Sequence, residues 1–122
     1  MRFTQDLSSG INLIRAYGGG ELRVNEHAYR GAVILSASTV IPEANIHNLD
    51  DLVSLDVSRV LALEPELVLL GTGTRQIFPA ASFGAQFLQA GIGFEAMDTS
   101  AACRTFNVLV GEQRRVAAML LI

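Results

Sequence analysis

The sequence predicts one three-layer α/β domain over residues 1–122, with a mixed, mostly parallel central sheet flanked by helices and an extra N-terminal antiparallel β-meander. Two observations predict this fold class. Strand-like runs separated by glycine turns come first along the chain, and apolar strand-like runs that alternate with helical patterns follow. The first order is typical of a meander, and the second of a parallel sheet with right-handed crossovers. A length of 122 residues and an apolar content of 50% suit one domain with its own core.

The meander is indicated by glycine turns and by short apolar runs. The triple glycine at 18–20 can supply the positive φ angles of a tight hairpin. The run AVIL at 32–35 is continuous and apolar, which is typical of a strand covered on both faces. Strands are therefore predicted over residues 11–17, 21–24 and 27–36.

An irregular segment is predicted after the meander, over residues 37–48. Pro42 disfavours the helical conformation in the residue before it, and the apolar residues around it suggest a loop that packs onto the body of the domain. Asp50 and Asp51 then predict a turn.

A short helix is predicted within residues 54–65. Asp56 can cap its start, since the carboxylate can accept a free backbone N–H bond. An apolar stripe at i, i+3 and i+4 spacing begins at Val57. Pro65 ends the helix because it lacks an N–H group.

The second half of the chain alternates strands and helices. Strands are predicted over 66–71, 93–97 and 114–122, and helices over 79–90 and 98–110. Pro79 suits the first helical turn, and Gly91 and Gly111 suit the two C-terminal caps. The pattern of 114–122 fits a buried strand or a helix equally, because periodicity alone does not separate the two. The stripe of the first helix that faces the sheet is predicted to be Phe83, Phe87 and Leu88.

The charged residues exclude several kinds of function. The formal net charge is −3 and the nine cations form no basic block, so nucleic-acid binding has little electrostatic support. There is no lysine, which excludes Schiff-base chemistry and a P-loop. Cys103 is the sole cysteine, so an intramolecular disulfide is impossible and a cysteine-built zinc site is not expected. We expect no cofactor and no metal.

The chain is expected to be a cytoplasmic protein without a membrane span. No stretch approaches the roughly 20 apolar residues that a membrane helix needs. The first ten residues, MRFTQDLSSG, resemble neither a signal peptide nor an amphipathic transit peptide.

A glycine loop follows the strand predicted over 66–71. Ligands of open α/β sheets lie beyond the carboxyl ends of the strands, where this loop begins. Its backbone N–H groups, its two hydroxyls and its arginine could hold an anion. The glycines could equally serve a sharp exit from a buried strand, and position 76 is glutamine, so the loop is not a GxGxxG motif. The candidate residues are Gly71, Thr72, Gly73, Thr74 and Arg75.

The start of the helix predicted over 98–110 is the second candidate segment. Asp98 and Thr99 can accept free backbone N–H bonds there, and capping alone would explain them. Arg104 and Asn107 lie on the polar face of this helix, which could be a solvated surface or part of a site. Cys103 lies on the apolar face and is expected to be a small core residue rather than a nucleophile.

The glycine loop GTG (71–73) and the run MDTSAACRTFNVL (97–109) resemble the Mth-type domain family, whose function is unknown. Its relatives include a mitochondrial respiratory complex I assembly factor and an adipogenesis-associated protein. The resemblance implies a three-layer α/β fold with an additional small sheet, favours a strand at 114–122, and implies no established enzyme. The positions that match the family pattern are Gly71, Thr72, Gly73, Met97, Asp98, Thr99, Thr105, Asn107 and Arg115.

Two functions remain open at this point. The first is a non-catalytic protein-binding or assembly module, because no histidine-paired nucleophile or other catalytic set is present. The alternative is a binder of a small molecule or anion, or an enzyme, with its site at the 71–75 loop and the Asp98/Thr99 helix start.

Overall fold

The structure is a computed structural model that describes residues 10–122, and it contains two β-sheets. The small sheet is antiparallel with the order β1-β2-β3, made of Ile14–Gly18, Glu21–Val24 and His27–Tyr29. The central sheet has the order β5-β4-β8-β6-β7. Its strands along the chain are β4 Ala32–Ser36, β5 Val40–Glu43, β6 Leu67–Gly71, β7 Gly93–Met97 and β8 Val116–Leu120. The decapeptide 1–10, on which the expectation about targeting signals rests, lies outside the described residues except for Gly10.

The pairing of the central sheet confirms the predicted fold class. β6 is parallel to both β7 and β8, and β4 is antiparallel to both β5 and β8. The two parallel pairs come from the alternating second half of the chain, in which a helix separates β6 from β7 and another separates β7 from β8. The sheet is therefore mixed, as predicted, but it is not mostly parallel, since two of its four pairings are parallel and two are antiparallel.

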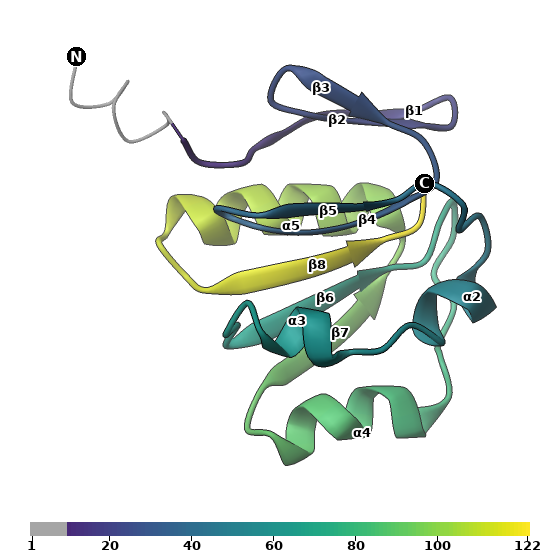
Figure 1. The fold of residues 1–122 in the computed structure, drawn as a ribbon, viewed down its shortest axis with the longest axis vertical. Coiled ribbons are helices and arrows are strands. Elements are labelled where there is room, and N and C mark those ends of the chain that lie inside the picture. Colours follow the sequence, from purple (N-terminus) through teal and green to yellow (C-terminus); the bar gives the residue numbers. More distant parts are fainter. Residues whose placement is uncertain (1–9) are drawn as a thin grey trace.

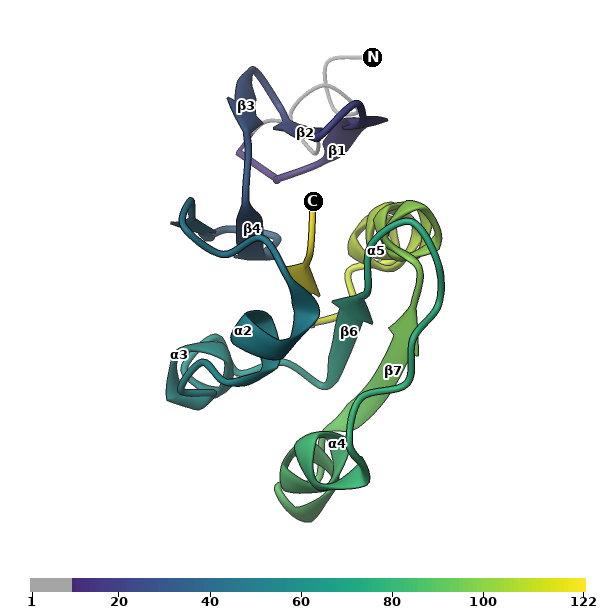
Figure 2. The same ribbon diagram turned by 90° about the vertical axis from the view of Figure 1, so that its right-hand side faces the viewer.

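Helices and the small sheet cover the two faces of the central sheet (Figures 1 and 2). One face carries α2 (Leu49–Val53), α3 (Ser58–Leu61) and α4 (Ala81–Gln89), and α5 (Thr99–Gly111) lies on the other face together with β1–β3. Each face has its own hydrophobic cluster. Phe106 is the largest fully buried side chain on the α5 side, and Phe87 is the largest on the α4 side.

The strand predicted over 27–36 is two strands that belong to different sheets. β3 ends at Tyr29 and β4 begins at Ala32, and Gly31 between them has a φ of +85°. A Cβ atom at Gly31 would lie 2.5 Å from the carbonyl oxygen of Ala44. Positive φ and this close backbone approach both require glycine. Gly31 therefore accounts for the separation of β3 from β4.

Residues 37–48 are not wholly irregular, contrary to the prediction. β5 occupies Val40–Glu43 and contains Pro42, which a central strand would not tolerate. β5 is the first strand in the sheet order, so only one of its sides pairs with a neighbour. An edge position leaves room for a residue without an N–H group, which explains the strand.

The turn predicted at Asp50 and Asp51 is the first turn of α2. The side chain of Asn48 caps this helix, because its Oδ1 accepts the N–H of Asp51 at 2.9 Å. The helix predicted within 54–65 is shorter than expected, since α3 spans Ser58–Leu61. Asp56 does bond near its start, where its Oδ1 accepts the N–H of Ser58 at 2.9 Å.

The helix boundaries in the second half differ slightly from the prediction. α4 begins at Ala81, so Pro79 lies before the helix rather than in its first turn. α5 runs through Gly111, and the left-handed residue that follows it is Gln113, with a φ of +63°. The segment 114–122 contains β8, so the strand interpretation is confirmed.

Candidate functional site

The glycine loop and the start of α5 lie side by side. They follow β6 and β7, which are parallel neighbours, so both segments leave the same edge of the sheet. The N–H of Thr72 donates to the carbonyl of Met97 at 2.8 Å, and the N–H of Thr99 donates to the carbonyl of Gly73 at 2.9 Å. The N–H of Gly73 donates in return to Oγ1 of Thr99 at 2.8 Å. The two candidate segments are thus brought together and joined by hydrogen bonds.

The two buried hydroxyls at this junction bond to the chain itself. Thr72 and Thr99 are 2% and 0% exposed. Oγ1 of Thr72 donates to the carbonyl of Arg75 at 2.7 Å and accepts the N–H of Ile77 at 3.1 Å. Oγ1 of Thr99 donates to the carbonyl of Leu121 at 2.7 Å. The Thr72 hydroxyl therefore closes its own loop, and the Thr99 hydroxyl links the start of α5 to Gly73 and Leu121.

The glycines of the loop permit close packing and an unusual backbone angle. A Cβ atom at Gly71 would lie 2.8 Å from a methyl group of Leu120 and 3.0 Å from Oγ1 of Thr99. Gly73 has a φ of +99°, which residues with a side chain rarely adopt. These glycines allow β6 to end directly against α5 and β8.

The outward-facing part of the junction consists of three side chains. Thr74 and Arg75 are exposed, and Asp98 is half-buried. Oδ1 of Asp98 accepts the N–H of Ala101 at 2.8 Å, which is the capping bond predicted for the start of α5. Thr74, Arg75 and Asp98 are the side chains at this junction that a ligand or a partner could reach from solvent.

Arg104 and Asn107 lie away from the glycine loop, further along α5. Nη1 of Arg104 donates to Oγ of Ser100 at 2.8 Å. The side chain of Asn107 makes two bonds to Ile14 of β1: its Oδ1 accepts the Ile14 N–H at 2.9 Å, and its Nδ2 donates to the Ile14 carbonyl at 2.8 Å. Asn107 therefore fastens the small sheet to α5.

Cys103 is a core residue, as the sequence predicts. It is 6% exposed and belongs to the hydrophobic cluster on the α5 side. Burial raises the pKa of its thiol to about 12, despite the opposing effect of the Arg104 charge. The thiol is protonated at neutral pH, and a protonated thiol is a poor nucleophile.

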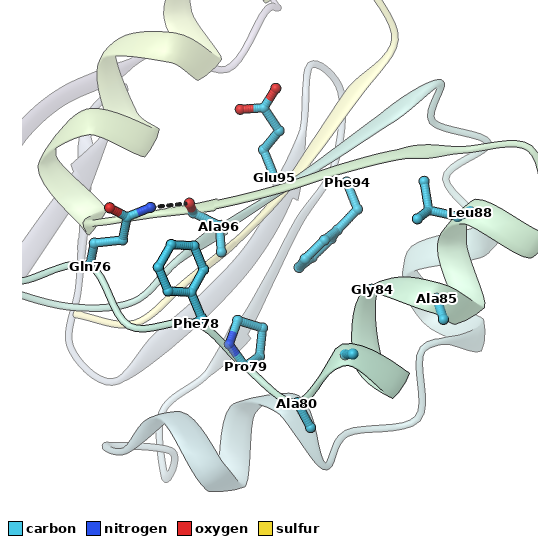
Figure 3. A pocket seen from close by; sticks show the side chains of 11 residues that line it. Gln76, Phe78, Pro79, Ala80, Gly84, Ala85, Leu88, Phe94, Glu95 and Ala96 are labelled. Atoms are coloured by element: carbon cyan, nitrogen blue, oxygen red, sulfur yellow. Dashed lines mark hydrogen bonds between the residues drawn. The ribbon is translucent and has the colours of Figure 1, made fainter.

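An apolar groove, which the sequence did not predict, lies beyond the glycine loop. It has a volume of about 500 Å³ and runs between the segment 76–80, α4 and β7 (Figure 3). Phe78 stands at its wall with 78% of its surface exposed, and Leu88 is 63% exposed. Leu88 was predicted to face the sheet, and its exposure corrects that prediction. The residues that line the groove are Gln76, Phe78, Pro79, Ala80, Ala81, Gly84, Ala85, Leu88, Phe94, Glu95 and Ala96.

Phe94, which lines the groove, packs against two further aromatic rings. Phe94 stacks on Phe87 with ring centroids 5.6 Å apart, and it meets Phe83 edge-to-face at 5.5 Å. A Cβ atom at Gly84 would lie 2.7 Å from the ring of Phe94. One signal could have revealed the groove: small residues at 80, 81, 84 and 85 directly follow Phe78, so that part of α4 cannot cover an aromatic side chain.

Among residues 10–122, no group of three or more His, Cys, Asp or Glu side chains is arranged to hold a metal ion. In the same part of the chain, no helix combines the length and the hydropathy that crossing a membrane requires.

Comparison with protein families matches residues 14–121 to a family described as "Protein of unknown function (DUF498/DUF598)". A "13 kDa major membrane protein" of Francisella tularensis subsp. holarctica is 33% identical over 110 residues, covering 88% of each chain. "NADH dehydrogenase [ubiquinone] 1 alpha subcomplex assembly factor 3" of Danio rerio is 34% identical over 123 residues, covering 96% of this chain and 68% of the relative.

A solved structure of a Bordetella pertussis protein, described as a "Mth938-like domain", has the same fold. The superposition gives a TM-score of 0.77 at 28% identity and covers 93% of this chain and 87% of that one. The resemblance to the Mth-type family is therefore confirmed.

Proposed function

The chain belongs to the DUF498/DUF598 family of proteins of unknown function, and we propose that it is a non-catalytic protein-binding module that engages its partner through the groove beside β7. The observation that carries this proposal is the exposure of Phe78 and Leu88 around a pre-formed apolar groove. Large exposed apolar side chains around a concave surface mark interaction sites. Aromatic anchors contribute disproportionately to the binding energy of protein interfaces.

The chemistry of the lining favours a protein over a small polar ligand. Small-molecule sites combine apolar walls with a few convergent polar groups. In this groove, Gln76 already donates to the carbonyl of Ala96 at 3.1 Å, and Glu95 points to the other side of β7 (Figure 3). The lining thus offers a hydrophobic surface with few free polar groups, which suits an apolar segment of another chain.

The family relationship supports the same role. The Danio rerio relative is named as an assembly factor, and this name fits a protein-binding role. The exposed residues Thr74 and Arg75 lie next to the groove along the chain, so we propose that they form part of its rim. Gly71, Thr72, Gly73 and Thr99 would then act as the support that holds this rim in place.

A small anionic ligand at the glycine loop is the second candidate function. It is favoured by the meeting of the 71–75 loop with the start of α5. Thr74 and Arg75 would be its contacts, because the hydroxyls of Thr72 and Thr99 already bond to the backbone. A thermal-shift titration with inorganic phosphate tests it: a rise in Tm that Arg75→Ala abolishes would support the anion site, and an unchanged Tm would remove it.

The protein-binding proposal is tested by affinity capture from the native cells. The tagged chain is compared with the double variant Phe78→Ser, Leu88→Ser and with Val108→Ser, which removes an apolar side chain that is 58% exposed on α5. We expect a stoichiometric partner that the double variant retains at least about tenfold less, because an aromatic anchor is lost. Val108→Ser should retain it fully. Equal retention by all three chains, or no stoichiometric partner, would contradict the proposal.

Cellular location is part of the same proposal. We place the module in the cytoplasm, and cell fractionation tests this placement. Recovery of the native protein in the soluble cytoplasmic fraction would support it, whereas recovery with a membrane fraction would contradict it.

A further inference from the structure

The outer edge of β7 is the less protected edge of the central sheet. β7 is the last strand in the sheet order, and within residues 10–122 no strand pairs with its outer side. The opposite edge strand, β5, contains Pro42, and its Glu43 forms an ion pair with Arg59. Proline and charged side chains are two means by which proteins protect edge strands from pairing with other chains. β7 has no proline along its length, and its one charged side chain is Glu95.

The hydrogen bonds of β7 reveal which of its peptide groups face outward. The N–H of Gly93 and the carbonyl of Met97 both bond toward β6, at 3.0 and 2.8 Å. In a parallel pair, alternate residues direct their backbone groups toward the same neighbour. The backbone groups of Phe94 and Ala96 therefore point away from β6, toward the groove side of the strand.

One of these outward groups already has a substitute partner. The side-chain amide of Gln76 donates to the carbonyl of Ala96 at 3.1 Å (Figure 3). A side-chain N–H thus lies where the backbone N–H of an added strand would lie. The carbonyl of Ala96 can therefore accept a hydrogen bond from outside the sheet. The Gln76 side chain could be displaced by the backbone N–H of a partner.

The side chains beside this edge present a different chemistry on each face of the sheet. Phe94 and Ala96 face the apolar groove, and Phe78 forms the groove wall. Glu95, between them in sequence, is exposed on the opposite face. A strand added to β7 would alternate in the same way, because successive side chains of a strand point to opposite faces.

We infer that the partner binds as an additional strand on β7, through an extended segment in which apolar residues that enter the groove alternate with basic residues that face Glu95. This inference rests on the proposed function. Addition of a strand to an exposed sheet edge is an established mode of peptide recognition, in which backbone bonds give affinity and side-chain pockets give specificity. The groove supplies the apolar specificity, and Glu95 supplies the complementary charge.

A second copy of this chain is a poorer occupant of the edge. Glu95 is the central residue of β7. An antiparallel pairing of two copies about a two-fold axis at the strand centre would place Glu95 of one chain directly opposite Glu95 of the other. Like charges in directly opposed positions are destabilising. A basic residue of another protein makes an attractive pair at the same position.

The inference is tested with random short peptides displayed on phage and selected on the full chain, with the Phe78→Ser variant as counter-target. We expect enriched peptides that alternate apolar and basic residues. N-methylation of the peptide nitrogens that face β7 should weaken binding at least about tenfold, because strand pairing needs these donors. Bound peptide should also slow the hydrogen exchange of the Phe94 and Ala96 amides, measured by NMR.

A matched pair of charge reversals tests the predicted alternation. Glu95→Lys should weaken binding of the basic peptides at least about tenfold, through loss of attraction and added repulsion. Glu112→Lys, at the exposed C-terminal end of α5, makes the same change in net charge and should leave the affinity unchanged.

Three outcomes would overturn the inference, and they can be told apart. Enriched peptides that depend on Phe78 but leave the Phe94 and Ala96 amides unprotected would refute strand addition, while the groove would still be a protein-binding site. A free chain that is dimeric, with these amides already protected, would assign the edge to a second copy. If no peptide binds the wild-type chain more tightly than it binds the Phe78→Ser variant, both the strand addition and the proposed function are refuted.

Discussion

At the scale of single residues, Thr99 holds three segments of the protein together. Its side chain accepts a bond from the glycine loop and donates one to the end of β8, and its own N–H bonds back to the loop. The hydroxyl is fully buried. Both of its side-chain partners are backbone groups, and a buried backbone group that loses its partner carries a large desolvation cost.

We predict that Thr99→Val destabilises the protein by at least about 2 kcal/mol, since each of two backbone groups left unpaired costs about 1–3 kcal/mol. Valine keeps the shape of threonine, so the loss reflects the missing hydrogen bonds. Urea denaturation measures it. Thr74→Val, in the exposed part of the same loop, is the control and should change the stability by less than about 0.5 kcal/mol. Equal stability of the two variants would contradict the assigned role of the Thr99 hydroxyl.

The Cys103 thiol should react very slowly in the folded protein. Burial raises its pKa from the ordinary value of 9.0 to about 12, so at pH 8 the folded chain has on the order of a thousandfold less thiolate than the unfolded chain. The rate of alkylation, followed by mass spectrometry with and without denaturant, measures the difference. The protonated thiol contributes to stability below pH 9, and this contribution is lost as the pH rises from 9 toward 12. Comparable rates in the folded and unfolded chains would show that Cys103 is accessible.

At the scale of secondary-structure elements, two contacts set the positions of the helices. The Asn107 side chain fastens β1 to α5 with a pair of hydrogen bonds. On the other face, α4 approaches β7 closely because Gly84 presents no side chain to the ring of Phe94. The groove that carries the proposed function therefore depends on how closely α4 lies against β7.

Gly84→Ala tests this dependence. The added methyl group would meet the Phe94 ring at 2.7 Å, and the ring is held by its contacts with Phe83 and Phe87. Gly111→Ala, in α5, is the matched control, because a Cβ atom there meets nothing within 4 Å. Both changes improve helix propensity, so we expect Gly84→Ala to be less stable than Gly111→Ala by about 1–3 kcal/mol of overpacking cost. Thermal denaturation measures it, and equal stability would show that α4 can move freely away from β7.

At the scale of the whole molecule, the sequence predicts the fold better than the groove. The alternating second half was predictable because apolar runs, capping residues and glycines are local signals. The sequence left open whether the 71–75 loop and the start of α5 lie together, because this depends on β6 and β7 being neighbouring parallel strands. β5 was missed because Pro42 is tolerated only at a sheet edge, and the edge position depends on pairing with β4.

The candidate site was predicted only in part, because the environment of its side chains also depends on how distant elements pack. The sequence identified the junction residues Thr72, Asp98 and Thr99, but it could not show that the two threonine hydroxyls bond to the backbone. The exposure of Phe78 and Leu88 depends on which elements pack over them, and apolar residues in a helical pattern are ordinarily assigned to the core. Surface apolar residues of this kind emerge only once the neighbouring elements are in place.

Binding of another protein in the groove beside β7 can be measured by site-specific photo-crosslinking in living cells. A benzophenone amino acid is placed at position 78 in the groove wall or at position 108 on α5, and the cells are irradiated. We expect a discrete crosslinked product of one partner from position 78, with at least about tenfold less from position 108. Equal or diffuse crosslinking from the two positions would show that the groove is not the binding site.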